Sequence, residues 1–304
     1  MPPARQSTRG GRRVVDCVLA FRYRRARAAA RALILALSLG VGAGADAENV
    51  APAHELPAIG IIIDDLGYRR LDGLRAIELP GPVAYAILPH TPYASRLAAI
   101  AYQLDKEVLL HVPMESSLGK ALGPGALTNG MARLEVQAVL DAGLASVPHV
   151  SGINNHMGSL LTREERAMGW VMEWMSENGS LYFVDSLTSS NSVALHSARR
   201  AELRSIARDV FLDTTPDPII IRRQFEQLLA LARARGTGLA IGHPYPQTLA
   251  VLRELLSNPS RHGVELVSVR ELIERRSRTP QVTASNSQID GERANYAHHR
   301  PIGN

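Results

Sequence analysis

Short apolar runs alternate with longer amphipathic stretches along most of the chain. The runs are rich in Val, Ile, Leu and aromatic residues, and each is short enough to form one strand. They show little polar alternation, which is typical of strands buried on both faces of a parallel sheet. The eight runs lie at residues 59–63, 83–88, 108–112, 150–154, 181–184, 210–212, 239–241 and 264–267.

The stretches between the runs carry helix start and stop signals. Thr162 opens the sequence T-R-E-E, which predicts a capping box and a helix that stops at Gly179. Asp217, followed by proline, predicts the start of another helix, which ends at Gly236. Strands that alternate with helices in this way predict one α/β domain, a parallel sheet or barrel, over residues 58–275. Further helices are expected at about 131–145, 248–257 and 269–275.

The two ends of the chain differ in composition from the part between them. Residues 1–47 are arginine-rich and contain an apolar run at 32–43 and an A-x-A sequence at 45–47, which predicts a signal peptide. An uncleaved N-terminal anchor is the alternative, and in either case we expect the rest of the protein in the periplasm or elsewhere outside the cytoplasm. Once the leader is removed, no stable membrane span is expected. Residues 48–57 are predicted to be a linker and 276–304 a disordered polar tail.

Positive charge is concentrated in the leader. The chain has a formal net charge of +5, but residues 1–47 hold nine arginines and two aspartates, which leaves the remainder at −2. This distribution argues against a nucleic-acid partner. Cys17, the one cysteine, lies in the same segment, so the predicted domain offers no thiolate for catalysis, metal binding or a disulfide.

The first apolar run ends in two carboxylates, Asp64 and Asp65, with Gly67 as a turn residue behind them. Adjacent residues of a strand point to opposite faces, so these side chains do different jobs unless the chain bends there. One of them is suited to hold a metal ion while the other acts as a base. The alternative is that the pair caps a helix near residues 68–74.

Polar and ionisable residues follow most of the other runs as well. In a parallel α/β fold the carboxyl ends of the strands share one face, and sites form on that face. Imidazoles and carboxylates at so many strand ends favour a site for a divalent metal ion. The residues at or near the later strand ends are His90, His111, Glu115, Asn154, Asn155, His156, Asp185, Ser186, Asp209, Asp213 and His243.

Six motifs carry a family resemblance: in chain order they are IIIDDLG, HVPME, GINNHMGS, FVDSLTS, RDVFLD and IGHPYPQT. In them the chain resembles the divergent polysaccharide deacetylase family, a distant branch of the polysaccharide deacetylases of carbohydrate esterase family four. The resemblance extends from about residue 59 to 269. It implies a distorted (β/α) barrel of seven or eight mostly parallel strands with an incomplete strand ring. It also implies metal-dependent removal of acetyl groups from an N-acetylated polysaccharide or peptidoglycan-like glycan of the cell envelope.

The metal site that the resemblance implies departs from the family pattern at one position. Asp65 and His111 match family ligands, but Glu115 stands where the family has a second histidine, four residues after the first. Either Glu115 supplies an oxygen ligand, or another imidazole replaces the missing second histidine. His156 is the preferred replacement. The expected set is therefore Asp65, His111 and His156, because one carboxylate with two imidazoles is a common zinc set with an open position. The expected cofactor is a divalent ion, with Zn²⁺ preferred.

The resemblance also implies the catalytic roles, with Asp64 as the base and His243 as the general acid. The family has an arginine after the fourth run that holds the base, and this chain lacks it. Arg208 or the asparagine amides are the candidates to replace it. The aspartates expected to orient the imidazole of His243 are Asp185, Asp209 or Asp213. The residues expected to bind substrate or to support the ligands are Glu115, Asn155, Ser159, Asp185, Arg208 and Asp213.

The departures from the pattern leave a second class of function open. A catalytically inactive glycan-binding or scaffolding protein of the cell envelope would use the same fold. Aromatic residues make up only 5% of the chain, which leaves few rings to stack on sugars. The candidates for stacking are Tyr68, Tyr85, Tyr93 and Tyr182.

Overall fold

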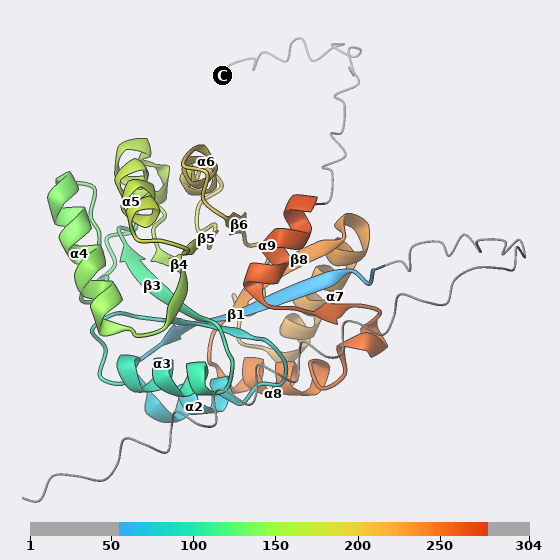
Figure 1. Ribbon diagram of the computed structural model, residues 1–304. Coiled ribbons are helices and arrows are strands. Elements are labelled where there is room, and N and C mark those ends of the chain that lie inside the picture. The colour runs from blue at the N-terminus through green and yellow to red at the C-terminus, as the bar shows by residue number, and fades with distance from the viewer. Residues whose placement is uncertain (1–54, 279–304) are drawn as a thin grey trace, which may run out of the picture. The chain divides into compact units, whose positions relative to one another are not determined.

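The computed structural model describes residues 55–278, so the predicted leader and the chain from residue 279 onward lie outside the described residues. The strands, labelled as in Figure 1, are β1 (Ala58–Leu66), β2 (Ala84–Ile87), β3 (Val108–Met114), β4 (Val150–Met157), β5 (Tyr182–Asp185), β6 (Ser205–Ala207), β7 (Val210–Phe211), β8 (Thr237–Gly242) and β9 (Glu265–Leu266). The helices are α2 (Arg70–Ile77), α3 (Ala94–Gln103), α4 (Arg133–Ser146), α5 (Glu165–Glu177), α6 (Ala194–Arg200), α7 (Pro218–Arg235), α8 (Pro246–Leu255) and α9 (Val269–Arg278), with short 3₁₀ helices η2 (Leu161–Arg163) and η3 (Pro259–His262).

The strands form one sheet in the order β6-β5-β4-β3-β2-β1-β8-β7, and β9 pairs beside β1. Every strand pairing among the described residues is parallel. All eight predicted runs form strands, and the predicted parallel α/β barrel-like fold is confirmed. Strand β6 was not predicted, because its three residues carry too little pattern to be recognised.

The two edges of this curved sheet belong to one short segment, residues 205–211. Its first half pairs with β5 and its second half with β8. The change of partner occurs between neighbouring residues: the N–H of Arg208 donates to the carbonyl of Asp185 in β5, and the N–H of Asp209 donates to the carbonyl of Leu239 in β8. One chain segment thus bridges the two ends of the sheet, as in a distorted barrel.

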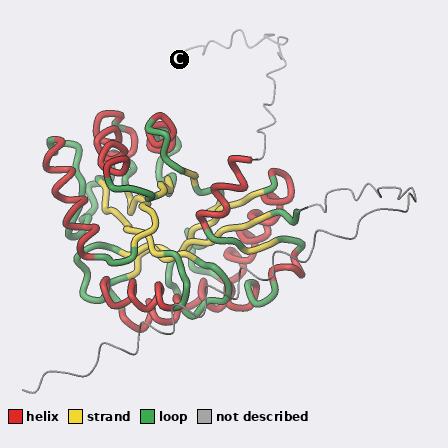
Figure 2. The backbone as a smooth tube through the Cα atoms, in the orientation of Figure 1, coloured by secondary structure: helices red, strands yellow, loops and turns green. Residues whose placement is uncertain are grey.

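Alternate residues of the strands face two different apolar layers. On β1, Ile59, Ile61 and Ile63 pack in the larger layer, which also contains side chains from the helices α2 to α8. Ile62 faces the smaller layer, which is made by the strands and by α9. Figure 2 shows the strands gathered inside the surrounding helices. The smaller layer is therefore the interior of the barrel.

Helix α9 closes the interior at the end where the strands begin. The carboxylate of Glu107, directly before β3, accepts hydrogen bonds from the N–H groups of Val269 (2.7 Å) and Arg270 (3.2 Å). Leu272 is fully buried, and a Cβ atom at Gly60 would lie only 2.8 Å from a methyl group of its side chain, so α9 packs closely against β1 at this glycine. The opposite end of the barrel, where the strands finish, stays available for a site.

The ends of the helices confirm some predicted signals and correct others. The side chain of Asp217 accepts hydrogen bonds from two backbone N–H groups of α7, and Gly236 ends this helix with a φ of 81°. The predicted capping box at Thr162 is wrong. Thr162 lies in η2, and its hydroxyl donates to the carbonyl of Gly158 (2.7 Å). Helix α5 begins only at Glu165. Helices α3 and α6 were not predicted.

The predicted tail began at residue 276, but helix α9 continues to Arg278. The reason is that the guanidinium of Arg276 donates to the carboxylate of Asp209 and to the hydroxyl of Thr237 (2.9 Å), which ties the last turn to the barrel. Within residues 55–278, no helix combines the length and the apolar character that a membrane span needs.

Candidate active site

The polar residues at the strand ends form the top layer of the barrel interior. Side chains repeat every second residue on one face of a strand, so the residue two positions after an interior apolar residue also points inward. Four strands continue from the apolar interior to a buried or partly buried polar side chain in this way. The pairs are Ile62 and Asp64, Leu109 and His111, Val184 and Ser186, and Ile241 and His243.

Asp65 joins this layer because the backbone bends at the end of β1. Its φ is 61°, in the left-handed region, and the pairing of β1 with β2 shifts register between Ile63 and Leu66. The two neighbouring carboxylates therefore reach the same site, which a regular strand would prevent. The helix-capping alternative is wrong, because the N-cap of α2 is Arg69 and no side chain caps that helix.

Asp65, His111 and His156 come together as a possible metal site. Oδ1 of Asp65 lies 2.8 Å from Nδ1 of His156 and 3.2 Å from Nε2 of His111. One ligand atom from each residue lies within 4.8 Å of the other two. The same Asp65 oxygen is buried, and within the described part of the chain it makes no hydrogen bond of good geometry. A buried oxygen of this kind, facing two imidazole nitrogens, fits a shared divalent ion.

The surroundings of the two aspartates move their pKa values in opposite directions. Burial raises the pKa of Asp64 and outweighs the opposing effect of the nearby imidazoles of His111 and His243. Burial also acts to raise the pKa of Asp65, but the adjacent imidazoles of His111 and His156 lower it well below the usual range. Neighbouring carboxylates with divergent pKa values are suited to different roles, one as a ligand and one as a base.

The carboxylate of Asp64 is held by an asparagine. Nδ2 of Asn154 donates to Oδ1 of Asp64 over 2.8 Å. Arg208, the other candidate, instead donates to the backbone carbonyls of Ser186 (2.7 Å) and Leu187 (2.9 Å). The asparagine amides were the second predicted candidate for this task, and Asn154 is the asparagine that holds Asp64. Its register position beside His111 in the β3–β4 pair, on the inward-facing repeat, is the signal that would have identified it.

His243 is oriented by one of the three candidate aspartates. Oδ1 of Asp213 lies 2.9 Å from Nδ1 of His243, and Oδ2 accepts from the backbone N–H of His243 (2.6 Å) and from the hydroxyl of Thr248 (2.7 Å). Although burial opposes protonation, the hydrogen bond and charge of Asp213 raise the pKa of His243 to about 9. Nε2 of His243 lies 3.7 Å from the second oxygen of Asp65, so the imidazole borders the possible metal site. Asp209 binds Leu239 and Arg276 away from this layer.

Glu115 and Ser159 organise the rim instead of joining the metal group. Oε2 of Glu115 accepts from the backbone N–H of Asn129 (2.7 Å) and so fastens the loop that follows β3. In the described residues, the group that brings Asp65 together with two imidazoles does not include Glu115. The hydroxyl of Ser159 lies 3.0 Å from that of Ser117 and 3.3 Å from that of Ser116, and together they link the β3 and β4 loops.

Asn155 and Asp185 support the loops next to the site. Oδ1 of Asn155 accepts from the N–H of Ser186 (2.9 Å), which fixes β4 to the end of β5. The carboxylate of Asp185 accepts from the N–H of Leu187 (2.8 Å) and from the hydroxyl of Ser192 (2.7 Å). Both side chains hold backbone in place beside the interior polar layer.

For two of the four tyrosines that were candidates to stack on sugars, the prediction is wrong. Tyr85 and Tyr182 are fully buried, because their positions on β2 and β5 place them in the two apolar layers. Tyr68 and Tyr93 are exposed. A tyrosine that the sequence analysis missed, Tyr245, is 42% exposed and has its ring centroid 5.5 Å from that of His243.

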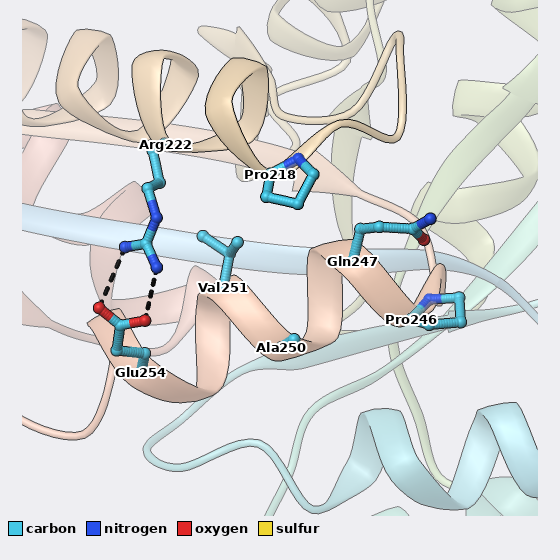
Figure 3. A pocket seen from close by; sticks show the side chains of 7 residues that line it. All are labelled: Pro218, Arg222, Pro246, Gln247, Ala250, Val251 and Glu254. Atoms are coloured by element: carbon cyan, nitrogen blue, oxygen red, sulfur yellow. Dashed lines mark hydrogen bonds and ion pairs between the residues drawn. The ribbon is translucent and has the colours of Figure 1, made fainter.

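A separate surface pocket of about 460 Å³ lies between α7 and α8. Figure 3 shows Pro218 and Pro246 at one end of it and the ion pair between Arg222 and Glu254 at the other. None of the residues that line it belongs to the predicted site. The polar layer of the barrel and this pocket are therefore distinct features.

Comparison with known proteins decides the family. Residues 61–273 match the family described as divergent polysaccharide deacetylase. The chain belongs to this family. The match runs from the fourth residue of β1 to the middle of α9, and so it includes every residue of the interior polar layer.

Two curated relatives of this chain are uncharacterized. The protein is 36% identical over 200 residues to YibQ of Escherichia coli, a match that covers 66% of this chain and 62% of that protein. It therefore corresponds to less than two thirds of that relative. It is 34% identical over 200 residues to a protein of Haemophilus influenzae, covering 66% of this chain and 71% of that one.

The solved structure of uncharacterized protein ATU2773 from Agrobacterium tumefaciens has the same fold. It superposes with a TM-score of 0.69 at 23% sequence identity, over 72% of this chain and 90% of that one. This likeness supports the barrel architecture.

Proposed function

We propose that this protein is an exported, metal-dependent deacetylase that removes acetyl groups from an N-acetylated glycan of the cell envelope. The observation that carries the proposal is the convergence of a possible metal site, a base and an acid in the interior polar layer. Oxygen atoms of Asp65 lie within 3.7 Å of nitrogens of His111, His156 and His243. Membership of a family described as polysaccharide deacetylases supports the class of substrate.

Asp65, His111 and His156 would hold the ion, with Zn²⁺ as the expected metal. A divalent ion there would polarise the acetyl carbonyl and lower the pKa of a water molecule. The second oxygen of Asp65 lies 3.7 Å from Nε2 of His243, and an oxygen of Asp64 lies 3.7 Å from Nε2 of His111, so an acid and a base border the ligands.

Asp64 serves as the general base in this proposal. Its pKa is raised by burial, which makes its carboxylate a better proton acceptor than that of an exposed aspartate. The hydrogen bond from Asn154 fixes one oxygen of Asp64, and the other oxygen lies 3.7 Å from Nε2 of His111. Asp64 therefore accepts the proton of the attacking water.

His243 serves as the general acid. With a pKa of about 9 it is protonated at neutral pH, and Asp213 binds Nδ1–H so that Nε2–H points toward the site. The imidazolium donates this proton to the amine that leaves when the acetamide C–N bond breaks. General acid–base catalysis of this kind typically increases the rate of the chemical step by about 10²- to 10⁴-fold.

Export is proposed from the composition of residues 1–47, which lie outside the described residues. The linker at 48–57 would then connect the leader to the barrel. Amino-terminal sequencing of protein recovered from the periplasm tests this, and a mature chain that begins shortly after residue 47 is expected. Recovery of the full chain from the cytoplasm alone would contradict it.

Acetate release from N-acetylated peptidoglycan fragments and chitin oligosaccharides tests the enzymatic activity. The zinc-loaded protein is expected to release acetate, and the Asp64→Asn and His243→Ala variants to be strongly impaired. Glycan binding without acetate release would favour an inactive binding protein and would contradict the proposal. A surface variant, Glu254→Gln, serves as the control, because Glu254 lies in the separate pocket between α7 and α8.

A further inference from the structure

Asn154 is fully buried and lies between a possible metal ligand and the proposed base. Its Oδ1 is 2.8 Å from Nδ1 of His111, and its Nδ2 is 2.8 Å from Oδ1 of Asp64. The parallel register of β3 and β4 pairs Asn154 directly with His111, so the backbone itself places the amide there. A further contact, 3.3 Å from Nδ2 to the hydroxyl of Ser186, completes its surroundings.

The chemistry of the two partners fixes the orientation of the amide. The carboxylate of Asp64 accepts hydrogen bonds, so the NH₂ group of Asn154 must face it and the amide oxygen must face His111. An amide oxygen only accepts, which requires the imidazole to carry its proton on Nδ1. The lone pair of Nε2 then points toward the oxygen of Asp65, 3.2 Å away, where an ion would bind.

We infer that Asn154 is a positioning residue that uses its two amide groups to select the metal-binding tautomer of His111 and to hold the base Asp64. This inference rests on the proposed function. It gives one buried side chain two separable tasks, one toward the metal and one toward the proton transfer. Partners that orient a metal-binding histidine change metal affinity or activity by about 10- to 100-fold when they are removed.

Two substitutions separate the tasks. Asn154→Asp keeps an oxygen to accept from Nδ1 of His111 but loses the NH₂ group that holds Asp64. Asn154→Leu has a similar volume and loses both bonds. Asn258→Asp is the matched control for the added charge, because Asn258 is exposed and its side-chain oxygen accepts a hydrogen bond from the nearby Ser260 hydroxyl (2.7 Å).

Competition titration of zinc against a chelating dye, together with steady-state acetate release, gives the readouts. Asn154→Leu is expected to weaken zinc binding by about 10- to 100-fold. Asn154→Asp is expected to bind zinc within about threefold of wild type, while its kcat falls by about tenfold or more at unchanged KM. Equal losses of affinity in both variants, or wild-type behaviour of both, would overturn the inference.

A measurement on the unaltered protein covers the case in which a variant does not fold. ¹⁵N NMR of the zinc-loaded wild-type protein is expected to show the imidazole proton of His111 on Nδ1, slow to exchange with water. A proton on Nε2 would overturn the inference. Absence of acetate release by the wild type would instead overturn the proposed function, and the zinc affinities and the NMR signal would still decide the role of Asn154.

Discussion

At the scale of single residues, Asp64 and Asp65 show how two identical side chains obtain different chemistry. A left-handed φ at Asp65 turns it into the same site as Asp64, where it meets two imidazoles that lower its pKa. Asp64 keeps a raised pKa because burial dominates. The assignment of ligand and base to this pair thus has a physical cause in the bend at the end of β1.

Replacing the base separates catalysis from metal binding. Asp64→Asn removes the proton acceptor but keeps the shape of the side chain, so kcat is expected to fall by about 10²- to 10⁴-fold. Zinc affinity is expected to stay within about tenfold of wild type, because Asp64 is outside the proposed ligand set. Steady-state kinetics and zinc titration of the same preparation measure both. A variant that retained its turnover would rule out Asp64 as the base.

The pH dependence of kcat/KM is expected to be bell-shaped. The acidic limb reflects protonation of Asp64, and activity is lost as the pH falls through its raised pKa. His243 must be protonated to act as the acid, so activity is lost as the pH rises through its pKa of about 9. Asp213→Asn removes the charge that raises this pKa, and the alkaline limb should therefore move to lower pH by about one unit or more. An unchanged alkaline limb would contradict the role of Asp213.

At this scale, polar residues within or just after the apolar runs indicated where the site would form, and the family resemblance implied the grouping of Asp65, His111 and His156. The sequence left open whether Arg208 or an asparagine amide holds Asp64, and which aspartate orients His243. Hydrogen-bond partners depend on the register between strands that are far apart in sequence, which one strand's pattern does not contain.

At the scale of elements, α9 stabilises the barrel, although it lies near the end of the domain. Leu272 is fully buried against β1 and β8 in the barrel interior. Leu272→Ala is expected to lower the free energy of unfolding by about 2–5 kcal/mol, because a cavity forms where the barrel is closed. Leu134→Ala on α4, where the side chain is 76% exposed, is the control and should change it by less than about 0.5 kcal/mol. Chemical denaturation measures both, and equal small effects would show that α9 is dispensable.

Elements were predicted well where their signals are local. Asp217 and Gly236 mark the ends of α7 as expected, since a cap and a left-handed glycine act within one turn. The place of α9 inside the barrel and the bridging segment 205–211 were not predicted. Both depend on contacts with distant strands, such as the bond of Arg276 to Asp209, which a single sequence does not reveal.

At the scale of the whole described domain, binding of zinc should be coupled to stability. A ligand that binds only the folded state at 100 times its Kd stabilises it by about 2.7 kcal/mol, so zinc should raise Tm and a chelator should reverse the effect. His156→Ala is expected to abolish this response. Glu115→Gln should retain it, because the carboxylate of Glu115 binds the loop at Asn129. Loss of the response in Glu115→Gln with retention in His156→Ala would reverse the ligand assignment.

The architecture explains why these residues meet at all. Parallel strands bring their carboxyl ends to one end of the barrel, and α9 fills the other. Polar side chains that continue the inward-facing repeat of each strand are therefore gathered in one layer, where Asp65 joins them through its bend. The position of the candidate site follows from this arrangement of the strands and α9.

Anomalous diffraction at the zinc edge, from crystals of the zinc-loaded protein, tests the central claim most directly. One peak is expected at the end of the barrel where the strands finish, within about 2.0–2.3 Å of Asp65, His111 and His156. A peak bound by other side chains, or the absence of any peak in this layer at saturating zinc, would contradict the account.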